Sequence, residues 1–281
     1  MREIKREVIV EAVKAICSDA HYELDTALVD KLKSFRAEEE HKLAIDVLDT
    51  IIENQEIAKN ERKPLCQDTG IGIFFVEMGR EVYIPDGSLS EILEEAMSEV
   101  YLEEPFRFSV VSDPLFGRVN TGNNTPPMIH WDIVDGDQLT ITFMPKGGGA
   151  ENTSALKMFN PLDPLSEISD FIVNTVKEAG GKPCPPILVG VGIGGSFDYA
   201  ALLAKKALLT PLNESNPNPK WAELEQSLLE RINSLGIGPM GLGGKTTALS
   251  VKIKEYPCHI ASLPVAINIQ CHSHRHKTVI I

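Results

Sequence analysis

The sequence predicts an α/β fold, in which a mixed β-sheet is flanked by helices and preceded by a helical N-terminal lobe. Apolar residues recur at helical spacing through roughly the first sixty residues. Beyond them, short runs rich in β-branched and aromatic residues alternate with helical patterns, which is typical of α/β proteins. We therefore expect a helical lobe at residues 1–60 and an α/β region at residues 61–281 that forms one continuous domain.

The composition is that of a globular protein with an acidic surface. The 281 residues are 43% hydrophobic and 24% charged, which is sufficient for a substantial core. The net charge of −13 argues against binding to nucleic acid or to a membrane surface, because phosphate contacts need a basic face. No apolar run reaches the roughly 18 residues of a membrane span, and Glu3, Glu7 and Glu11 lie where a targeting peptide avoids acids. We expect a cytoplasmic protein.

Three amphipathic helices are expected between Ile4 and about Lys59. In each of them the apolar residues fall on one face of a helix with about 3.6 residues per turn. These residues are Ile4, Val8 and Ile16 in the first helix, Leu28 and Leu32 in the second, and Leu43, Val47 and Ile51 in the third.

Strand and helix patterns alternate along the rest of the chain. Asp135-Gly136, between two strand-like runs, predicts a β-hairpin, because this dipeptide favours the tight turns that join antiparallel strands. The expected strands are 71–79, 80–87, 107–112, 128–136, 137–145, 186–194, 248–256 and 260–270, and the expected helices are 89–102, 164–179, 196–209 and 221–235.

Three of the five cysteines, Cys66, Cys184 and Cys271, lie in predicted loops that are far apart in the sequence. An odd number of cysteines in a chain without an export signal favours thiols or metal ligands over disulfides. A structural zinc site usually takes its ligands from short-range pairs such as CxxC, which this spacing does not provide. The pattern suits a buried inorganic cluster held at three corners. Cys17, on the apolar side of the first expected helix, is expected to pack in the core.

Two glycine-rich segments leave other classes of protein open. Residues 190–195, GVGIGG, match the G-x-G-x-x-G pattern after a strand and before a helix, so a dinucleotide-binding module is one alternative. However, a Pro- and Asn-rich loop stands where the acidic residue of such a site is expected. Residues 243–246, GGKT, imitate the end of a phosphate loop but follow a helical pattern. A zinc-stabilised interaction domain built on the tail from Cys271 is a further alternative.

Several polar motifs are ambiguous when they are taken alone. Lys146–Gly149 ends a strand and begins a helix, where backbone N–H groups could bind a carboxylate or simply form a turn. Arg107 could pair with a carboxylate or lie on the solvent face. His259 could be a buried structural residue or a catalyst. None of these motifs decides the function by itself.

Five segments in a fixed order form a recognisable signature. They are PLCQDTG at 64–70, PKGGGAENTSALK at 145–157, GKPCPPILVGVGIGG at 181–195, SLGIGPMGLGG at 234–244 and CHIASLPVAINIQC at 258–271. With these segments the chain resembles the alpha part of class I, iron–sulfur fumarases and tartrate dehydratases, from about Pro64 to its C-terminus.

The resemblance implies a 4Fe-4S cluster ligated by Cys66, Cys184 and Cys271, with one iron that no protein side chain binds. Thiolates are the ligands that such clusters require. The open iron would act as a Lewis acid on the hydroxyl and a carboxylate of the substrate, so that cleavage of the C–O bond does not expel bare hydroxide.

The resemblance also implies a site for a small dicarboxylate. Asp68 and His259 are expected to be catalytic, and His259 matches a family histidine near the reacting hydroxyl. Many relatives carry a Trp and a pair of arginines after the last cysteine, whereas this chain has HSHRH and keeps one arginine, Arg275. The residues expected to bind the substrate are Gln67, Arg107, Gly149 and Arg275.

The family completes its site with a beta region that carries further cationic carboxylate binders, and nothing after Cys271 resembles it. We therefore expect a separate beta subunit, in an α2β2 assembly, that offsets the unfavourable charge of −13. The expected activity is that of a hydro-lyase alpha subunit that catalyses the reversible hydration of fumarate to (S)-malate. The alpha subunit of an L(+)-tartrate dehydratase is the close alternative.

Overall fold

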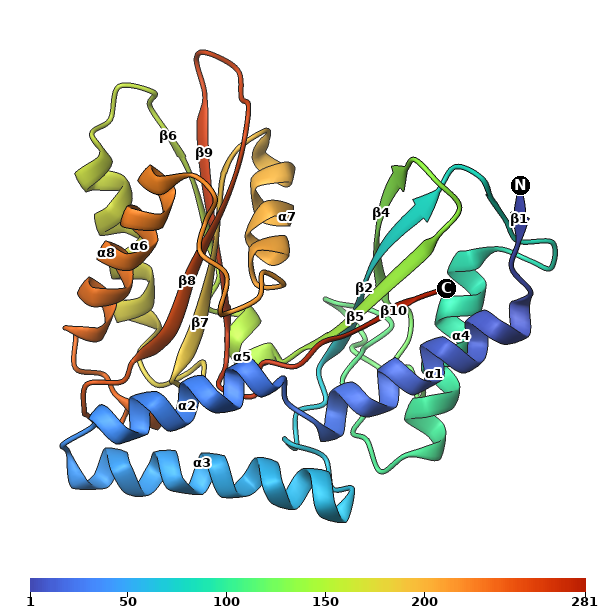
Figure 1. Cartoon of the computed structure of the whole chain (residues 1–281), viewed down its shortest axis with the longest axis horizontal. Coiled ribbons are helices and arrows are strands. Elements are labelled where there is room, and N and C mark those ends of the chain that lie inside the picture. The colour runs from blue at the N-terminus through green and yellow to red at the C-terminus, as the bar shows by residue number, and fades with distance from the viewer. The chain divides into compact units, whose positions relative to one another are not determined.

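The computed structural model describes every residue from Met1 to Ile281, and the chain forms two compact units. Unit 1 consists of residues 1–25, 55–148 and 275–281, and unit 2 consists of residues 26–54 and 149–274. Figure 1 shows the helices and strands of each unit, which are described in turn. Helices and mixed sheets occur in both, which confirms the predicted α/β class with its helical N-terminal region.

The three N-terminal helices form where the apolar pattern predicts them, but they are shared between the units. The expected division into 1–60 and 61–281 therefore does not coincide with the two units. None of the helices has both the length and the apolar character needed to cross a membrane. Helix α1 (Arg6–Tyr22) belongs to unit 1, α2 (Thr26–Glu38) belongs to unit 2, and α3 (Lys42–Glu61) continues from unit 2 into unit 1.

Unit 1 is built on a four-stranded mixed sheet with α1 and α4 packed on one face. The strand order is β10-β5-β2-β4, in which β2 is antiparallel to β5 and parallel to β4. Its core includes Phe74 and Phe143, whose ring centroids lie 5.0 Å apart. The bounds are α4 (Leu89–Glu103), β2 (Ile71–Gly79), β4 (Met128–Val134), β5 (Leu139–Lys146) and β10 (Lys277–Ile280), with a short parallel pair β1 (Arg2–Glu3) and β3 (Val82–Tyr83).

The prediction of a β-hairpin at Asp135-Gly136 is wrong. Strands β4 and β5 do not pair with each other, because β2 lies between them and pairs with both. The turn itself forms, with φ of 103° at Gly136, and its carbonyl accepts a hydrogen bond from the N–H of Glu81 at 3.0 Å. Strand β2 is buried along most of its length and takes a central position, which leaves the more exposed β4 at the edge.

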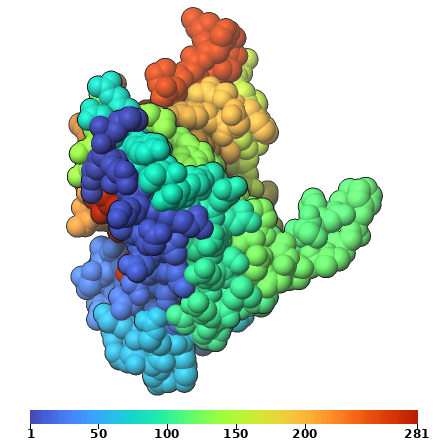
Figure 2. All heavy atoms as spheres, turned by 90° about the vertical axis from the view of Figure 1, so that its right-hand side faces the viewer, coloured from blue at the N-terminus to red at the C-terminus, as the bar shows by residue number.

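The strand predicted at 107–112 is instead the base of an arm formed by residues 111–120. A single β-bridge between Val111 and Asn120 joins its two sides. The carboxylate of Asp113 accepts hydrogen bonds from three backbone N–H groups of the arm, which lowers the pKa of this carboxyl. Figure 2 shows this light green part of the chain projecting from the surface.

Unit 2 is built on a second mixed sheet, of strand order β6-β9-β7-β8, with helices on both faces. Helices α6 and α8 pack on one face and α7 packs on the other (Figure 1). The sequence did not predict β6. The bounds are α5 (Gly148–Glu151), β6 (Ala155–Phe159), α6 (Leu165–Ala179), β7 (Ile187–Gly194), α7 (Phe197–Ala207), α8 (Pro219–Asn233), β8 (Ala248–Tyr256) and β9 (Leu263–Gln270), with a 3-10 turn at Pro239–Gly241.

The glycines of GVGIGG serve the packing of α7 against β7. All eight residues of β7 are buried, and its isoleucines and valines face α6 and α8. A Cβ atom on Gly190 or Gly192 would lie closer than any real Cβ contact to the carbonyl oxygens of Ala204 and Ala200, respectively. The helix can therefore approach the strand only because these two positions lack side chains.

We predict that Gly192→Ala lowers the stability of the chain by roughly 1–3 kcal/mol, because α7 must move away from β7. Gly117→Ala is the matched control, since its Cβ would meet no atom closer than 3.7 Å. Denaturant unfolding followed by circular dichroism measures both variants. Equal stability of Gly192→Ala and the wild type would contradict this account of the motif.

Candidate functional site

The loop that carries Cys66 is held firmly at both of its ends. It joins α3 to β2, with Cys66 partly buried, Gln67 exposed and Asp68 partly buried. The N–H of Leu65 donates to the carbonyl of His21 in α1 at 2.9 Å. At the other end Gly70 has φ of 77° and packs on the backbone of Lys146, which leaves no space for a side chain.

Asp68 connects three distant segments of unit 1. Its Oδ1 accepts from the N–H of Gly70 at 3.0 Å and its Oδ2 accepts from the N–H of Gly148 at 2.9 Å. Arg275 Nη2 donates to the backbone carbonyl of Asp68 at 2.5 Å. The structure thus brings together Asp68, the KGGG turn and Arg275, which the sequence places far apart.

Arg275 lies beneath the Cys66 loop, with only 4% of its surface exposed. Its Nη1 is buried and has no hydrogen-bond partner. A buried guanidinium group with a spare donor favours an anionic ligand nearby. The location of Arg275 is compatible with the expected role in binding a carboxylate.

His21 supports the same loop from inside the core. Its ring lies 2.7 Å from the carbonyl of Cys17 and 3.1 Å from both the carbonyl of Thr69 and the hydroxyl of Tyr101. Burial lowers the pKa of His21 to about 3, and the positive charge of Arg275 contributes further. The ring is therefore neutral at pH 7, carries one proton, and donates to only one of the two carbonyls.

Asn124 links the base of the arm to the Cys66 loop, a role that sequence reasoning missed. It is fully buried with φ of 62°. Its side-chain oxygen accepts from the N–H of Ser109 at 2.6 Å, and its Nδ2 donates to the carbonyl of Gly70 at 3.0 Å. Only the amide-rich composition of residues 120–124 pointed to this loop.

Arg107 reaches the Cys66 loop through its backbone. Its carbonyl accepts a hydrogen bond from the hydroxyl of Thr69 at 2.5 Å, while its side chain is exposed. The backbone of Arg107 is therefore fixed beside the loop, and its guanidinium group is accessible to a ligand.

In unit 2 the sheet brings two of the three expected cluster ligands together. Cys184 precedes β7 and Cys271 follows β9, and Leu188 of β7 is paired with Gln270 of β9. The carbonyl of Cys184 accepts from the N–H of His272 at 3.3 Å and lies 2.9 Å from its Nδ1. The two cysteines are partly buried and occupy adjoining loops at the same end of the paired strands β7 and β9.

The structure separates His259 from these cysteines. His259 lies in the exposed loop between β8 and β9, whereas Cys271 follows the far end of β9. Strand β9 spans roughly 24 Å at about 3.4 Å per residue. Within unit 2 an extended strand therefore holds His259 apart from Cys184 and Cys271, and the catalytic role expected for His259 stays a prediction.

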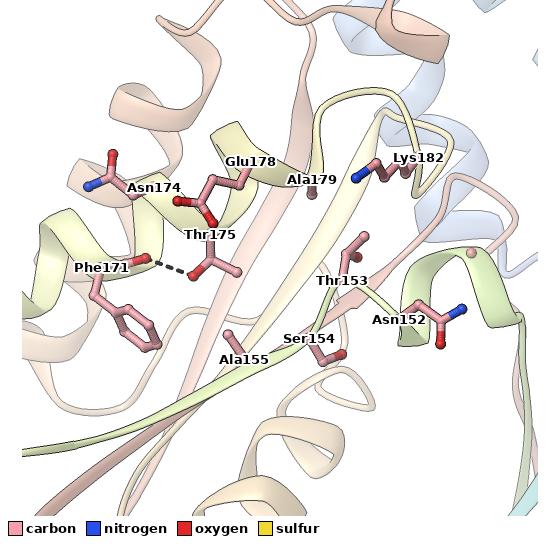
Figure 3. A pocket seen from close by; sticks show the side chains of 11 residues that line it. Asn152, Thr153, Ser154, Ala155, Phe171, Asn174, Thr175, Glu178, Ala179 and Lys182 are labelled. Carbon is pink, nitrogen blue, oxygen red and sulfur yellow. Dashed lines mark hydrogen bonds between the residues drawn. The ribbon is translucent and has the colours of Figure 1, made fainter. Parts of the chain in front are cut away.

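A polar cavity of about 550 Å³ adjoins the Cys184 loop in unit 2 (Figure 3). It lies between the segment from α5 into β6 and one side of α6, and it is lined by Gly149 and Lys182 among others. Gly149 packs against the backbone carbonyl of Lys182, so that an added Cβ would lie 3.1 Å from this oxygen. Gly149 thus belongs to the same neighbourhood as Cys184. No sequence motif predicted this cavity.

The three expected ligands are distributed over both units. Cys66 belongs to unit 1, while Cys184 and Cys271 belong to unit 2, and no disulfide is present. The structure contains no group of three or more His, Cys, Asp and Glu side chains arranged to hold a metal ion. The donor chemistry nevertheless fits an iron–sulfur cluster, because all three are thiols in ordered loops and the sheet register already brings two of them together.

The GGKT segment has no room for a phosphate. The side chain of Glu39 already accepts hydrogen bonds from the backbone N–H groups of Lys245 at 2.8 Å and Thr246 at 3.2 Å. Burial opposes ionisation of Glu39, but four backbone N–H donors lower its pKa overall. A carboxylate of the chain itself thus fills the position that a bound anion would take.

Comparison with known proteins agrees with this arrangement of motifs. The family model described as "Fumarate hydratase (Fumerase)" matches residues 10–280. The chain belongs to this family. The resemblance found in the sequence is therefore confirmed, and the family is one of hydro-lyases.

Curated relatives match almost the whole chain. A protein of Methanocaldococcus jannaschii named "Putative L(+)-tartrate dehydratase subunit alpha" is 42% identical over 274 residues, which are 96% of this chain and 94% of that protein. The L(+)-tartrate dehydratase subunit alpha of Escherichia coli O157:H7 is 37% identical over 258 residues, which are 90% of this chain and 84% of that protein. The protein of the same name from strain K12 is 36% identical over 258 residues.

We predict that the stability of the chain falls between pH 7 and pH 5 in a manner that depends on His21. The folded pKa of about 3 lies below the ordinary histidine pKa of 6.5, so the unfolded chain takes up a proton that the folded chain does not. The loss at pH 5 should be about 2 kcal/mol. Denaturant unfolding of the wild type and His21→Gln at both pH values measures it.

His259→Gln is the control for this experiment, because His259 is exposed. The difference in unfolding free energy between the two pH values should shrink by about 2 kcal/mol in His21→Gln and stay as in the wild type in His259→Gln. The same pH dependence in all three proteins would show that His21 is not the responsible group.

Proposed function

We propose that the chain is the alpha subunit of a hydro-lyase that adds water to, or removes it from, a four-carbon dicarboxylate. Cys66, Cys184 and Cys271 would hold a 4Fe-4S cluster. When bound, such a cluster supplies a Lewis-acidic iron that polarises the C–O bond of the substrate. The observation that carries the proposal is the convergence of Asp68, the KGGG turn and Arg275 beside Cys66 in a chain of the fumarate hydratase family.

The residues of unit 1 bind and orient the substrate in this proposal. Asp68, fixed by two backbone N–H groups, accepts a hydrogen bond from the reacting hydroxyl or water. The exposed guanidinium of Arg107 pairs with one carboxylate, and buried Arg275 contributes positive charge beneath the loop. Gln67, exposed between Cys66 and Asp68, supplies a further polar contact.

Unit 2 carries the remaining residues of the proposed set. Cys184 and Cys271 provide two thiols, and exposed Gly149 offers backbone that a substrate can approach closely. His259 lies at the opposite end of β9 from Cys271, and its expected catalytic role stays a prediction.

L(+)-tartrate is the first substrate candidate, because the similar curated relatives carry the name L(+)-tartrate dehydratase subunit alpha. Fumarate, with (S)-malate as its hydration product, is the second candidate and is favoured by the description of the matched family. The word "subunit" in the relatives' names supports a beta-type partner, which we propose to complete an α2β2 assembly. Its positive charge would offset the net charge of −13 of this chain.

The substrate is tested by turnover of L(+)-tartrate and (S)-malate by the anaerobically reconstituted pair of subunits. We expect turnover of at least one of them by the pair and none by this chain alone. The ratio of the two kcat/KM values assigns the substrate. Full turnover by the cluster-loaded chain without a partner would contradict the proposed assembly.

The cluster is tested by iron and acid-labile sulfide analysis of anaerobically purified chain. We expect about four irons per wild-type chain. Cys66→Ser, Cys184→Ser and Cys271→Ser should each lose most of the iron and the activity, whereas Cys258→Ser, at an exposed position, should keep both. One zinc without sulfide, retained in Cys66→Ser, would instead support a zinc-stabilised domain.

Asp68→Asn is expected to lower kcat by roughly 10²-fold or more, because the amide cannot accept hydrogen bonds through both of its atoms. Asp113→Asn is the matched control, since Asp113 also accepts backbone N–H groups but lies in the arm. The measurement is steady-state kinetics of the reconstituted pair at equal iron content. Wild-type kcat in Asp68→Asn would remove this residue from the catalytic set.

A further inference from the structure

Strand β4 forms an apolar edge on the sheet of unit 1. It pairs with β2 on one side only and is the last strand in the order β10-β5-β2-β4 (Figure 1). Several of its side chains are exposed although they are apolar, Ile133 most of all at 70%. An edge strand with accessible backbone groups and apolar side chains is a template for pairing with another strand.

The other sheet edges carry the lysines that usually prevent such pairing, and β4 does not. Lys277 lies in β10, the opposite edge of the same sheet. In unit 2, the edge strands β6 and β8 contain the exposed Lys157 and the partly exposed Lys254, respectively. The sequence of β4, MIHWDIV, has no lysine, no proline and an unbroken register with β2. Among the edges of the two four-stranded sheets, β4 is therefore the one without this protection.

The sequence of β4 can pair with a second, antiparallel copy of itself, because residues at equal distances on the two sides of Trp131 suit each other. We propose that two copies of the chain associate by antiparallel pairing of their β4 strands about a two-fold axis at Trp131. In this register each residue faces a suitable partner from the other copy. The facing pairs are Trp131 with Trp131, His130 with Asp132, Ile129 with Ile133, and Met128 with Val134.

The proposed register keeps the faces of the two sheets aligned. Ile129, Trp131 and Ile133 lie on the face of β4 that continues the core face of β2, since they pair with Phe74, Val76 and Met78. His130 and Asp132 lie on the other face, where the His130 ring stacks on Phe75 at 5.2 Å. Apolar pairs thus meet on one face and two His–Asp pairs meet on the other.

Neighbouring registers are less favourable. In a continuous sheet, residues that face each other across the two-fold axis must have their side chains on the same face. The axis can therefore pass only beside a residue of β4, so that the nearest alternatives to Trp131 are His130 and Asp132. A centre at Asp132 would place the two Asp132 carboxylates opposite each other. A centre at His130 would place the two histidines opposite each other and Asp132 opposite Met128. Only the centre at Trp131 places each Asp132 carboxylate opposite an imidazole that can donate a hydrogen bond to it.

This interface would supply the contact between the two alpha-type chains of the proposed α2β2 assembly, and to that extent it rests on the proposed function. The pairing itself is argued from β4 alone. Its test measures the mass of the purified chain rather than its turnover. A failure of the dimer and a failure of the hydro-lyase activity are therefore seen in different experiments.

Sedimentation velocity of the full chain tests whether it dimerises through β4. We expect a dimer for the wild type and a monomer for Ile133→Lys, whose exposed position tolerates a lysine in the folded monomer. Ile280→Lys is the matched control, because Ile280 is 62% exposed on the opposite edge strand β10 and should leave the dimer intact. A wild type that is monomeric at about 100 µM, or a dimer that survives Ile133→Lys, would overturn the proposal.

A charge exchange tests the register. His130→Asp places two carboxylates opposite each other twice per dimer, and Asp132→His removes the carboxylate from both His–Asp pairs, so each should raise the dimer Kd by roughly tenfold. The double variant His130→Asp/Asp132→His restores two His–Asp pairs per dimer and should recover most of this loss. Circular dichroism checks that all variants fold. Failure of the double variant to recover dimerisation would overturn the Trp131-centred register.

Discussion

The hydrogen bonds of Asp68 are the interaction on which the candidate site depends. The carboxylate accepts from Gly70 and Gly148, and the backbone carbonyl accepts from Arg275. These groups come from chain segments that meet only when the sheet of unit 1 has formed. Cys66, two residues before Asp68, owes its position to the same bonds. The local geometry is therefore a property of the folded unit and not of the loop sequence alone.

Two segments that supply site residues are also covalent connections between the units. The chain passes from unit 1 to unit 2 between Gly148 and Gly149, and it returns between His274 and Arg275. Both connections adjoin expected site residues, since the first lies in the KGGG turn and the second follows Cys271. In unit 2 the pairing of β7 with β9 brings the Cys184 and Cys271 loops together without any metal. Each unit thus prepares its own part of the proposed ligand set.

Local sequence patterns predicted the elements well and their arrangement poorly. The apolar periodicity located α1, α2 and α3, and the run at 71–79 coincides with β2. The hairpin at Asp135-Gly136 failed because a turn signal does not reveal that a more buried strand will insert between its neighbours. Strands β6 and β10 are too short to carry a periodic signal. They form through pairing with strands that are distant in the sequence.

The candidate site was predictable where a motif is local and not where it depends on topology. Asp68 and the KGGG turn were both expected to line a dicarboxylate site, and a hydrogen bond that the sequence did not predict joins Asp68 to Gly148. The sequence could not show that β9 separates His259 from Cys271, nor that Asn124 and His21 hold the Cys66 loop from behind. The glycines of GVGIGG were ambiguous until the position of α7 explained them.

The central proposal is that Cys66, Cys184 and Cys271 bind one cluster, and anomalous diffraction at the iron edge tests it most directly. Crystals of the chain with its partner, grown without oxygen, should show iron bonded to the Sγ atoms of Cys66, Cys184 and Cys271, with one iron bound by no protein side chain. Iron held by other side chains, or an absence of iron from active crystals, would contradict the account.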